Sequence, residues 1–78
     1  MSKTITELQE IFDKCKDLVK EGDITYSETW RLMTFDELMI SIKHNIAKIP
    51  VATKGKAIKD ALDAINYLAF WIVKKQRE

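Results

Sequence analysis

The sequence predicts an all-α fold, a single small domain of three helices, and three observations support this. The chain has 78 residues, of which 46% are apolar and 32% charged, with only two Gly and one Pro. This balance is typical of a soluble helical protein. Apolar residues recur at spacings of three and four over three long segments, and no segment reads as a strand. Residues 1–78 are therefore expected to form one helical domain.

The first helix is expected over residues 4–20. Its apolar stripe consists of Ile5, Leu8, Ile11, Phe12, Cys15, Leu18 and Val19. Thr4 and Glu7 have the spacing of a capping box, and Gly22 follows as a helix terminator. Residues 23–33 carry too much apolar surface for a polar linker, so we expect an ordered loop packed on the core.

The second and third helices are expected over residues 34–49 and 54–75. A capping-box pattern that starts at Thr34 marks the second helix, and Pro50 ends it because proline disfavours helix in the residue before it. Thr53 has the side chain of an N-cap for the third helix. The third helix has a wide apolar arc, made of Ile58, Ala61, Leu62, Ala64, Ile65, Leu68, Ala69, Trp71 and Ile72. One neighbouring helix cannot cover an arc of this width.

A chain of this length gains only a marginal core by itself, because it buries about 60–65% of its extended surface. We therefore expect a homodimer that completes a four- or six-helix bundle. Aromatic anchors dominate helix-mediated interfaces. The interface is accordingly predicted at Trp71, Leu68 and Ile72.

The net charge of +1 hides an asymmetry between the two halves of the chain. Residues 1–39 carry five basic and nine acidic side chains, whereas residues 40–78 carry eight basic and three acidic ones. This division suits association between unlike halves or an anionic ligand on the basic half. The sequence pI of about 7.8 is below the value of about 9 that is usual for a dedicated nucleic-acid binder.

The sequence predicts a cytoplasmic protein that does not enter a membrane. Its longest apolar run, residues 67–73, is too short to span a bilayer, and the first residues have no signal-peptide pattern. The only cysteine, Cys15, excludes an intrachain disulfide and a cysteine-rich zinc site, and its place on an apolar stripe predicts burial. The only histidine, His44, is expected on the polar side of the second helix. No catalytic residue is assigned.

Asp60 and Asp63 are the candidate metal ligands. Their spacing of three places both carboxylates on one face of a helix, where their oxygens suit a divalent cation such as Mg²⁺. The alternative is that they are solvated surface charges paired with Lys56 and Lys59.

The sequence contains the run Tyr26-Ser27-Glu28-Thr29-Trp30-Arg31. A predicted helix follows it, and then comes the run Asp60-Ala61-Leu62-Asp63-Ala64-Ile65-Asn66-Tyr67. In this order, the two runs resemble those of small MazG-like proteins. These belong to the all-α nucleoside triphosphate pyrophosphohydrolase superfamily. The resemblance implies that Asp60 and Asp63 match the second of its two magnesium-binding motifs. The first motif is not matched, because its glutamates are absent from Lys43-His44-Asn45-Ile46-Ala47-Lys48.

Five residues are candidates for binding a nucleotide or phosphate: Lys43, Lys48, Asn66, Tyr26 and Trp30. The two aromatic rings suit stacking on a base, and the alternative is that they cover the core. The two lysines near the turn between the second and third helices suit phosphate, and the alternative is a solvated turn.

The leading hypothesis is a degenerate, non-catalytic MazG-like module that mediates self- or partner association and keeps a nucleotide or phosphate site. One alternative is a magnesium-dependent nucleotide pyrophosphohydrolase. Another is a small helical protein that binds nucleic acid through a basic face.

Overall fold

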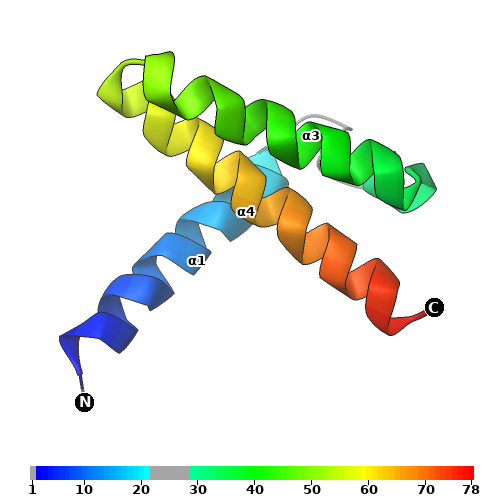
Figure 1. Ribbon diagram of the computed structural model, residues 1–78. Helices are drawn as coiled ribbons and strands as arrows, with labels where there is room; N and C mark the ends of the chain where they lie inside the picture. The colour runs from blue at the N-terminus through cyan, green and yellow to red at the C-terminus, as the bar shows by residue number, and fades with distance from the viewer. Residues whose placement is uncertain (1, 22–28) are drawn as a thin grey trace.

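The computed structural model describes residues 2–21 and 29–78 (Figure 1). They form three α-helices and two short 3-10 helices: α1 (Lys3–Glu21), η1 (Thr29–Leu32), α3 (Phe35–Lys48), η2 (Ile49–Val51) and α4 (Lys54–Gln76). Within these two ranges the chain has no strand. The predicted all-α class and the three predicted helices are confirmed.

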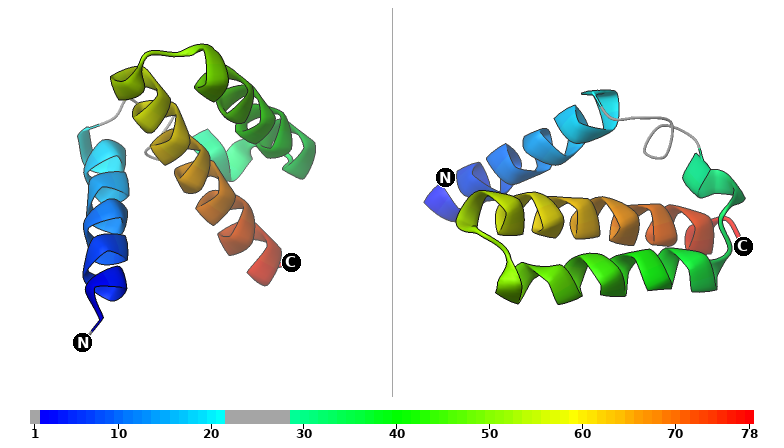
Figure 2. Two further views of the ribbon diagram at one scale, coloured as in Figure 1. Left: turned by 60° about the vertical axis from the view of Figure 1, so that its left-hand side comes forward. Right: turned by 90° about the horizontal axis from the view of Figure 1, so that it is seen from above.

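Helices α3 and α4 form an antiparallel hairpin, and they lie side by side over most of their length (Figure 2). Pro50 lies within η2, directly after α3. Because proline restricts the residue before it, the α-helix ends at Lys48 and the chain continues through a single 3-10 turn. The hairpin is therefore close to the prediction, with the end of α3 one residue earlier.

Helix α1 crosses α4 and then diverges from it toward the N-terminus (Figures 1 and 2). Cys15 is the one buried residue of α1. Its thiol lies 3.9 Å from the carbonyl oxygen of Leu62, to which it donates, and the side-chain amide of Asn66 donates to the Cys15 carbonyl oxygen at 3.1 Å. These contacts hold the second half of α1 against α4.

The helix starts have different caps. At α3, the Thr34 hydroxyl accepts from the Glu37 amide at 3.1 Å, and the Glu37 carboxylate accepts from the Thr34 amide at 2.9 Å. This confirms the capping box, and the hydrogen bond from the Thr34 amide lowers the pKa of Glu37. Thr53 is the N-cap of α4, although its side chain makes no capping hydrogen bond.

The prediction of a capping box at Thr4 is wrong. Helix α1 begins at Lys3, so Thr4 lies inside its first turn, and the Ser2 hydroxyl accepts a hydrogen bond from the Ile5 amide at 3.2 Å. Serine is a favourable N-cap, which explains the earlier start. The predicted terminator, Gly22, lies outside the described residues.

The core cluster consists of Trp30, Leu38 and Phe70. Trp30 comes from η1 and stacks on Phe70 of α4, with ring centroids 4.6 Å apart and planes 7° apart. Partly buried residues surround the cluster: Val19, Met33, Tyr67, Trp71 and Val73. The expected packing of the connecting loop on the core is confirmed for Trp30 and Met33, whereas Leu32 is 87% exposed. Residues 22–28 lie outside the described part of the chain.

Candidate functional site

The two candidate metal ligands lie in a lysine–aspartate cluster on α4. Asp60 is 1% exposed and Asp63 8% exposed, so neither is a solvated surface charge. Lys56 Nζ lies 2.6 Å and Lys48 Nζ 3.8 Å from Asp60 Oδ1, and Lys59 Nζ lies 3.1 Å from Asp63 Oδ2. Because Lys48 is the last residue of α3, the cluster also links the two helices of the hairpin.

The hydrogen bond from Lys56 lowers the pKa of Asp60, although burial of the carboxyl group opposes this shift. Asp60 is therefore ionised at neutral pH, as the short contact with the Lys56 ammonium requires. Its second oxygen, Oδ2, is buried and has no hydrogen-bond partner among the described residues. A buried carboxylate with one unpaired oxygen is costly, so the lysine contacts on Oδ1 are what stabilise the charge.

The cluster has few of the features of a metal centre. Within residues 2–21 and 29–78, no group of three or more His, Cys, Asp or Glu side chains is placed to hold a metal ion. Mg²⁺ requires near-octahedral oxygen coordination, whereas here each carboxylate is already bound by a lysine. Lys56 and Lys59 would therefore compete with a magnesium ion for the Asp60 and Asp63 carboxylates.

Among the described residues, the structure does not bring the candidates Lys43, Lys48, Asn66 and Trp30 together at one place. Lys43 is exposed on α3, whereas Lys48 is paired with Asp60 near the start of α4. Trp30 packs near the other end of α4, where it is 6% exposed and stacked on Phe70. Tyr26 lies outside the described residues.

Asn66 is also committed to a contact within the chain. It is 6% exposed, and its amide group binds the Cys15 carbonyl oxygen. The same region of α4 affects Cys15, because burial and the nearby charge of Asp63 raise the pKa of the thiol. His44 is exposed, as the sequence predicts.

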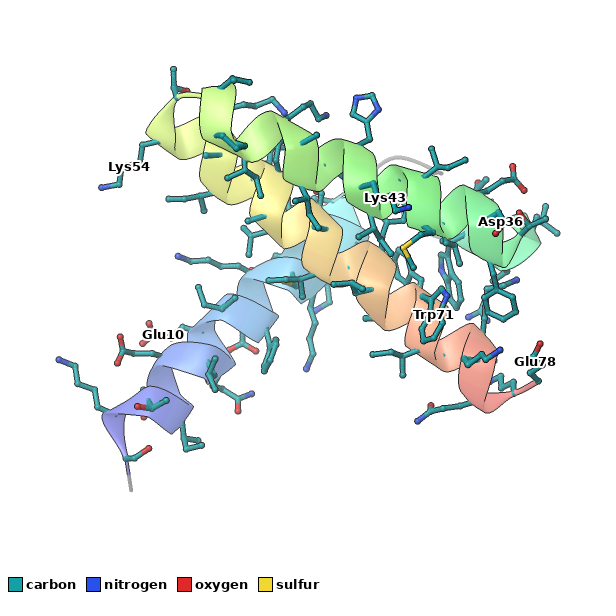
Figure 3. All side chains as sticks on the ribbon, viewed as in Figure 1. Glu10, Asp36, Lys43, Lys54, Trp71 and Glu78 are labelled. Carbon is teal, nitrogen blue, oxygen red and sulfur yellow. The ribbon has the colours of Figure 1, made fainter. Side chains whose placement is uncertain are left out.

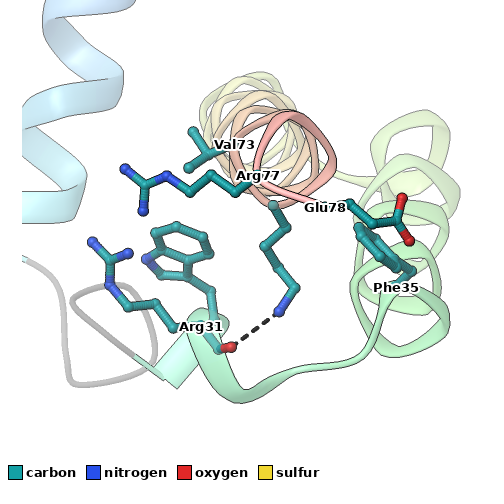
Figure 4. Close-up of a pocket in the computed structure, with 7 residues that line it drawn as sticks. Arg31, Phe35, Val73, Arg77 and Glu78 are labelled. Carbon is teal, nitrogen blue, oxygen red and sulfur yellow. Dashed lines mark hydrogen bonds between the residues drawn. The ribbon is translucent and has the colours of Figure 1, made fainter.

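A pocket of about 320 Å³ lies near the end of α4 (Figure 4). We call it the Trp30 pocket, and its lining residues are Trp30, Arg31, Phe35, Val73, Lys74, Arg77 and Glu78. Lys74 Nζ donates to the Arg31 carbonyl oxygen at 3.0 Å, which connects η1 to α4. The sequence has basic residues at both places, but they are more than 40 positions apart, and only the packing of η1 on α4 brings them together.

Apolar side chains remain exposed on one stretch of α1 and along α4. They are Ile5, Leu8 and Phe12 on α1, and Ile58, Leu68 and Ile72 on α4, each between 41% and 52% exposed. Of the predicted interface residues, Leu68 and Ile72 are thus among these exposed apolar side chains. Trp71 is half-buried and packs edge-on against Phe35, with ring centroids 6.0 Å apart. Figure 3 shows Trp71 and Lys54 toward opposite ends of α4.

None of the described helices has the length and apolar character needed to cross a membrane. Comparisons with protein-family models, curated proteins and solved structures found no match to this chain.

Proposed function

We propose that this protein is a non-catalytic helical module that associates with a second copy of itself through its apolar face. The apolar face consists of Ile5, Leu8 and Phe12 on α1, together with Ile58, Leu68 and Ile72 on α4. The observation that carries the proposal is that the chain's own helices leave about half of each of these side chains in solvent. Transfer of this surface from water to an interface is favourable by about 25 cal/mol per Å².

The spacing along α4 supports a helix as the covering element. Ile58, Ala61, Ile65, Leu68 and Ile72 follow one another at alternating steps of three and four. This is the spacing of a and d positions in a coiled coil, with isoleucine at each a position. Ala61 and Ile65 are half-buried and lie between exposed members of the stripe. A helix from another molecule would cover the stripe continuously.

The charges of the helices support a second copy as the partner. Helix α1 carries five acidic and four basic side chains, whereas α4 carries two acidic and five basic ones. Placing α1 of one copy beside α4 of the other brings opposite net charges together. A two-fold axis makes this contact twice, as is usual for a homodimer.

The state of the lysine–aspartate cluster supports a non-catalytic module. In the resemblance to MazG-like proteins, Asp60 and Asp63 correspond to magnesium ligands. Here Lys56 and Lys59 bind both carboxylates, and burial keeps Asp60 from solvent. The cluster is therefore suited to stabilising the hairpin.

The test is the mass of the protein in solution, measured by sedimentation equilibrium over a range of concentrations. The unmodified chain is expected to be a dimer. Phe12→Glu and Ile72→Glu each place a charge in the apolar face and should raise the dimer dissociation constant at least about tenfold, which corresponds to about 1.4 kcal/mol.

Ile40→Glu is the matched control, because Ile40 is 65% exposed on α3 and lies outside the apolar face. It makes the same chemical change and should leave the dimer intact. Circular dichroism confirms that each variant remains helical. A monomeric unmodified chain, or equal dissociation by Ile40→Glu, would show that the apolar face is not the interface.

A further inference from the structure

We propose that the Trp30 pocket binds a small anionic ligand, a phosphate or carboxylate group attached to one apolar ring. This site is separate from the apolar face and from the lysine–aspartate cluster. Its lining combines aromatic and aliphatic side chains with three basic ones, Arg31, Lys74 and Arg77, against one acidic one, Glu78. The volume of about 320 Å³ is at the small end of the range of about 300–1,000 Å³ that is usual for small-molecule pockets.

Arg77 supplies the main group for the anion. Within the described part of the chain, its guanidinium has no hydrogen bond or ion pair, and the residue is exposed. Figure 4 shows the guanidinium groups of Arg31 and Arg77 extending toward the same side of the pocket. The guanidinium of Arg77 suits a phosphate or carboxylate, whose oxygens accept paired N–H donors, and Arg31 adds a positive charge to the pocket lining.

The other charged residues of the pocket have contacts within the chain. Lys74 donates to the Arg31 carbonyl oxygen at 3.0 Å, so it fixes the pocket wall and adds a positive charge to it. The Glu78 carboxylate lies 2.7 Å from Lys75 Nζ, and this ion pair reduces its repulsion of an anion. The net effect of the lining is a positive potential near Arg77.

The apolar part of the pocket is made of packed aromatic and aliphatic side chains, which suit a ring. Trp30 is held by its stacking on Phe70, and the Arg31 guanidinium carbon lies 4.5 Å from the Trp30 ring centroid. Phe35 and Val73 are half-buried and complete the apolar wall. A ligand ring that packs on Val73, on the side of the pocket where Arg77 lies (Figure 4), would remove remaining exposed apolar surface from water, which inorganic phosphate cannot do.

Phenyl phosphate is a suitable probe because it joins one ring to one phosphate. Its binding is measured by isothermal titration calorimetry, beside inorganic phosphate and phenol. Arg77→Gln should weaken phenyl phosphate binding about tenfold, roughly the value of one charge-assisted hydrogen bond. Inorganic phosphate and phenol should each bind more weakly than phenyl phosphate to the unmodified chain.

Lys54→Gln is the matched control. It removes one positive charge from an exposed residue of α4 at the end away from the pocket, and it should change the affinity by less than about twofold. Equal loss in both variants, equal affinity for inorganic phosphate, or no binding of millimolar phenyl phosphate would overturn the proposal. Tighter, strongly salt-dependent binding of a single-stranded oligonucleotide would also overturn it, because that result indicates a nucleic-acid surface.

Discussion

The Asp60 carboxylate accepts a hydrogen bond of 2.6 Å from Lys56 Nζ while only 1% of Asp60 is exposed to solvent. Both residues belong to α4, one helical turn apart, and Lys48 approaches the same carboxylate oxygen from the end of α3. A buried charge needs an opposite charge near it. Asp60 therefore favours the alignment of α3 and α4 in which Lys48 also reaches it.

This contact predicts an acid-sensitive contribution to stability. The pKa of Asp60 is lower in the folded chain than the ordinary value of about 3.9 that applies to the unfolded chain. Ionised Asp60 therefore stabilises the fold above that ordinary pKa, and the contribution is lost as the pH falls through the folded pKa. The thermal midpoint of the unmodified chain should fall as the pH is lowered below about 4.

Asp60→Asn should lower the thermal midpoint by several degrees at neutral pH, because the amide carries no charge to pair with Lys56. Its midpoint should also depend less on pH in the acid range. Asp13→Asn removes an exposed carboxylate from α1 and serves as the control. Equal midpoints for the two variants at pH 7 would contradict the role given to Asp60.

The capping box of α3 predicts different effects for two threonines. Thr34→Ala removes the acceptor for the Glu37 amide and should cost about 1 kcal/mol, the usual value of an N-cap. In a domain of this size that loss lowers the thermal midpoint by about 4–8 °C. Thr53→Ala should have a smaller effect, because the Thr53 side chain makes no capping hydrogen bond. Thermal denaturation followed by circular dichroism compares the two, and a larger loss in Thr53→Ala would refute the assignment.

The stacking of Trp30 on Phe70 predicts a large loss of stability when the ring is removed. Trp30→Ala should cost about 3–5 kcal/mol, as for other buried aromatic residues, and this approaches the total stability of a small domain. Trp30→Phe keeps part of the stacking and should lie between Trp30→Ala and the unmodified chain. Leu32→Ala, two residues away and 87% exposed, should change the free energy of unfolding by less than about 0.5 kcal/mol. Urea denaturation measures all three.

The environment of Cys15 predicts slow alkylation. Burial, with a smaller effect from Asp63, raises the pKa of the thiol, so at pH 8 the reactive thiolate is scarcer in the folded chain than in the unfolded one. Iodoacetamide should modify the native protein far more slowly than the protein in concentrated urea, as followed by mass spectrometry. Similar rates in the two states would mean that the second half of α1 does not stay docked on α4.

Local patterns in the sequence predict the helices well, because they depend on neighbouring residues. The periodic apolar residues and the Thr34–Glu37 capping box predict the ends of α3 to within one residue. Pro50 predicts where this first helix of the hairpin ends. The start of α1 differs because Ser2 and Thr4 are both acceptable caps, and sequence spacing alone does not rank them. The capping hydrogen bond belongs to Ser2.

The burial and the partners of the candidate site residues depend on contacts between residues that are far apart in the sequence. Asp60 and Asp63 are evident as a pair in the sequence, but their burial and the approach of Lys48 follow from how α3 packs on α4. Asn66 is a candidate nucleotide-binding residue in the sequence, yet its side-chain amide donates to the backbone carbonyl of Cys15, 51 residues away. The Trp30 pocket likewise exists only because η1 folds against the end of α4.

The sequence by itself determined the helical class, the three helices and the apolar stripes, since hydrophobic period, caps and proline act over a few residues. Tertiary structure alone decided which apolar residues are buried and which stay exposed. Cys15 is buried and in contact with Leu62 and Asn66 of α4. Phe12, one turn earlier on the same stripe, is 48% exposed. The crossing of two helices sets that difference, and it depends on side-chain packing between segments far apart in the chain.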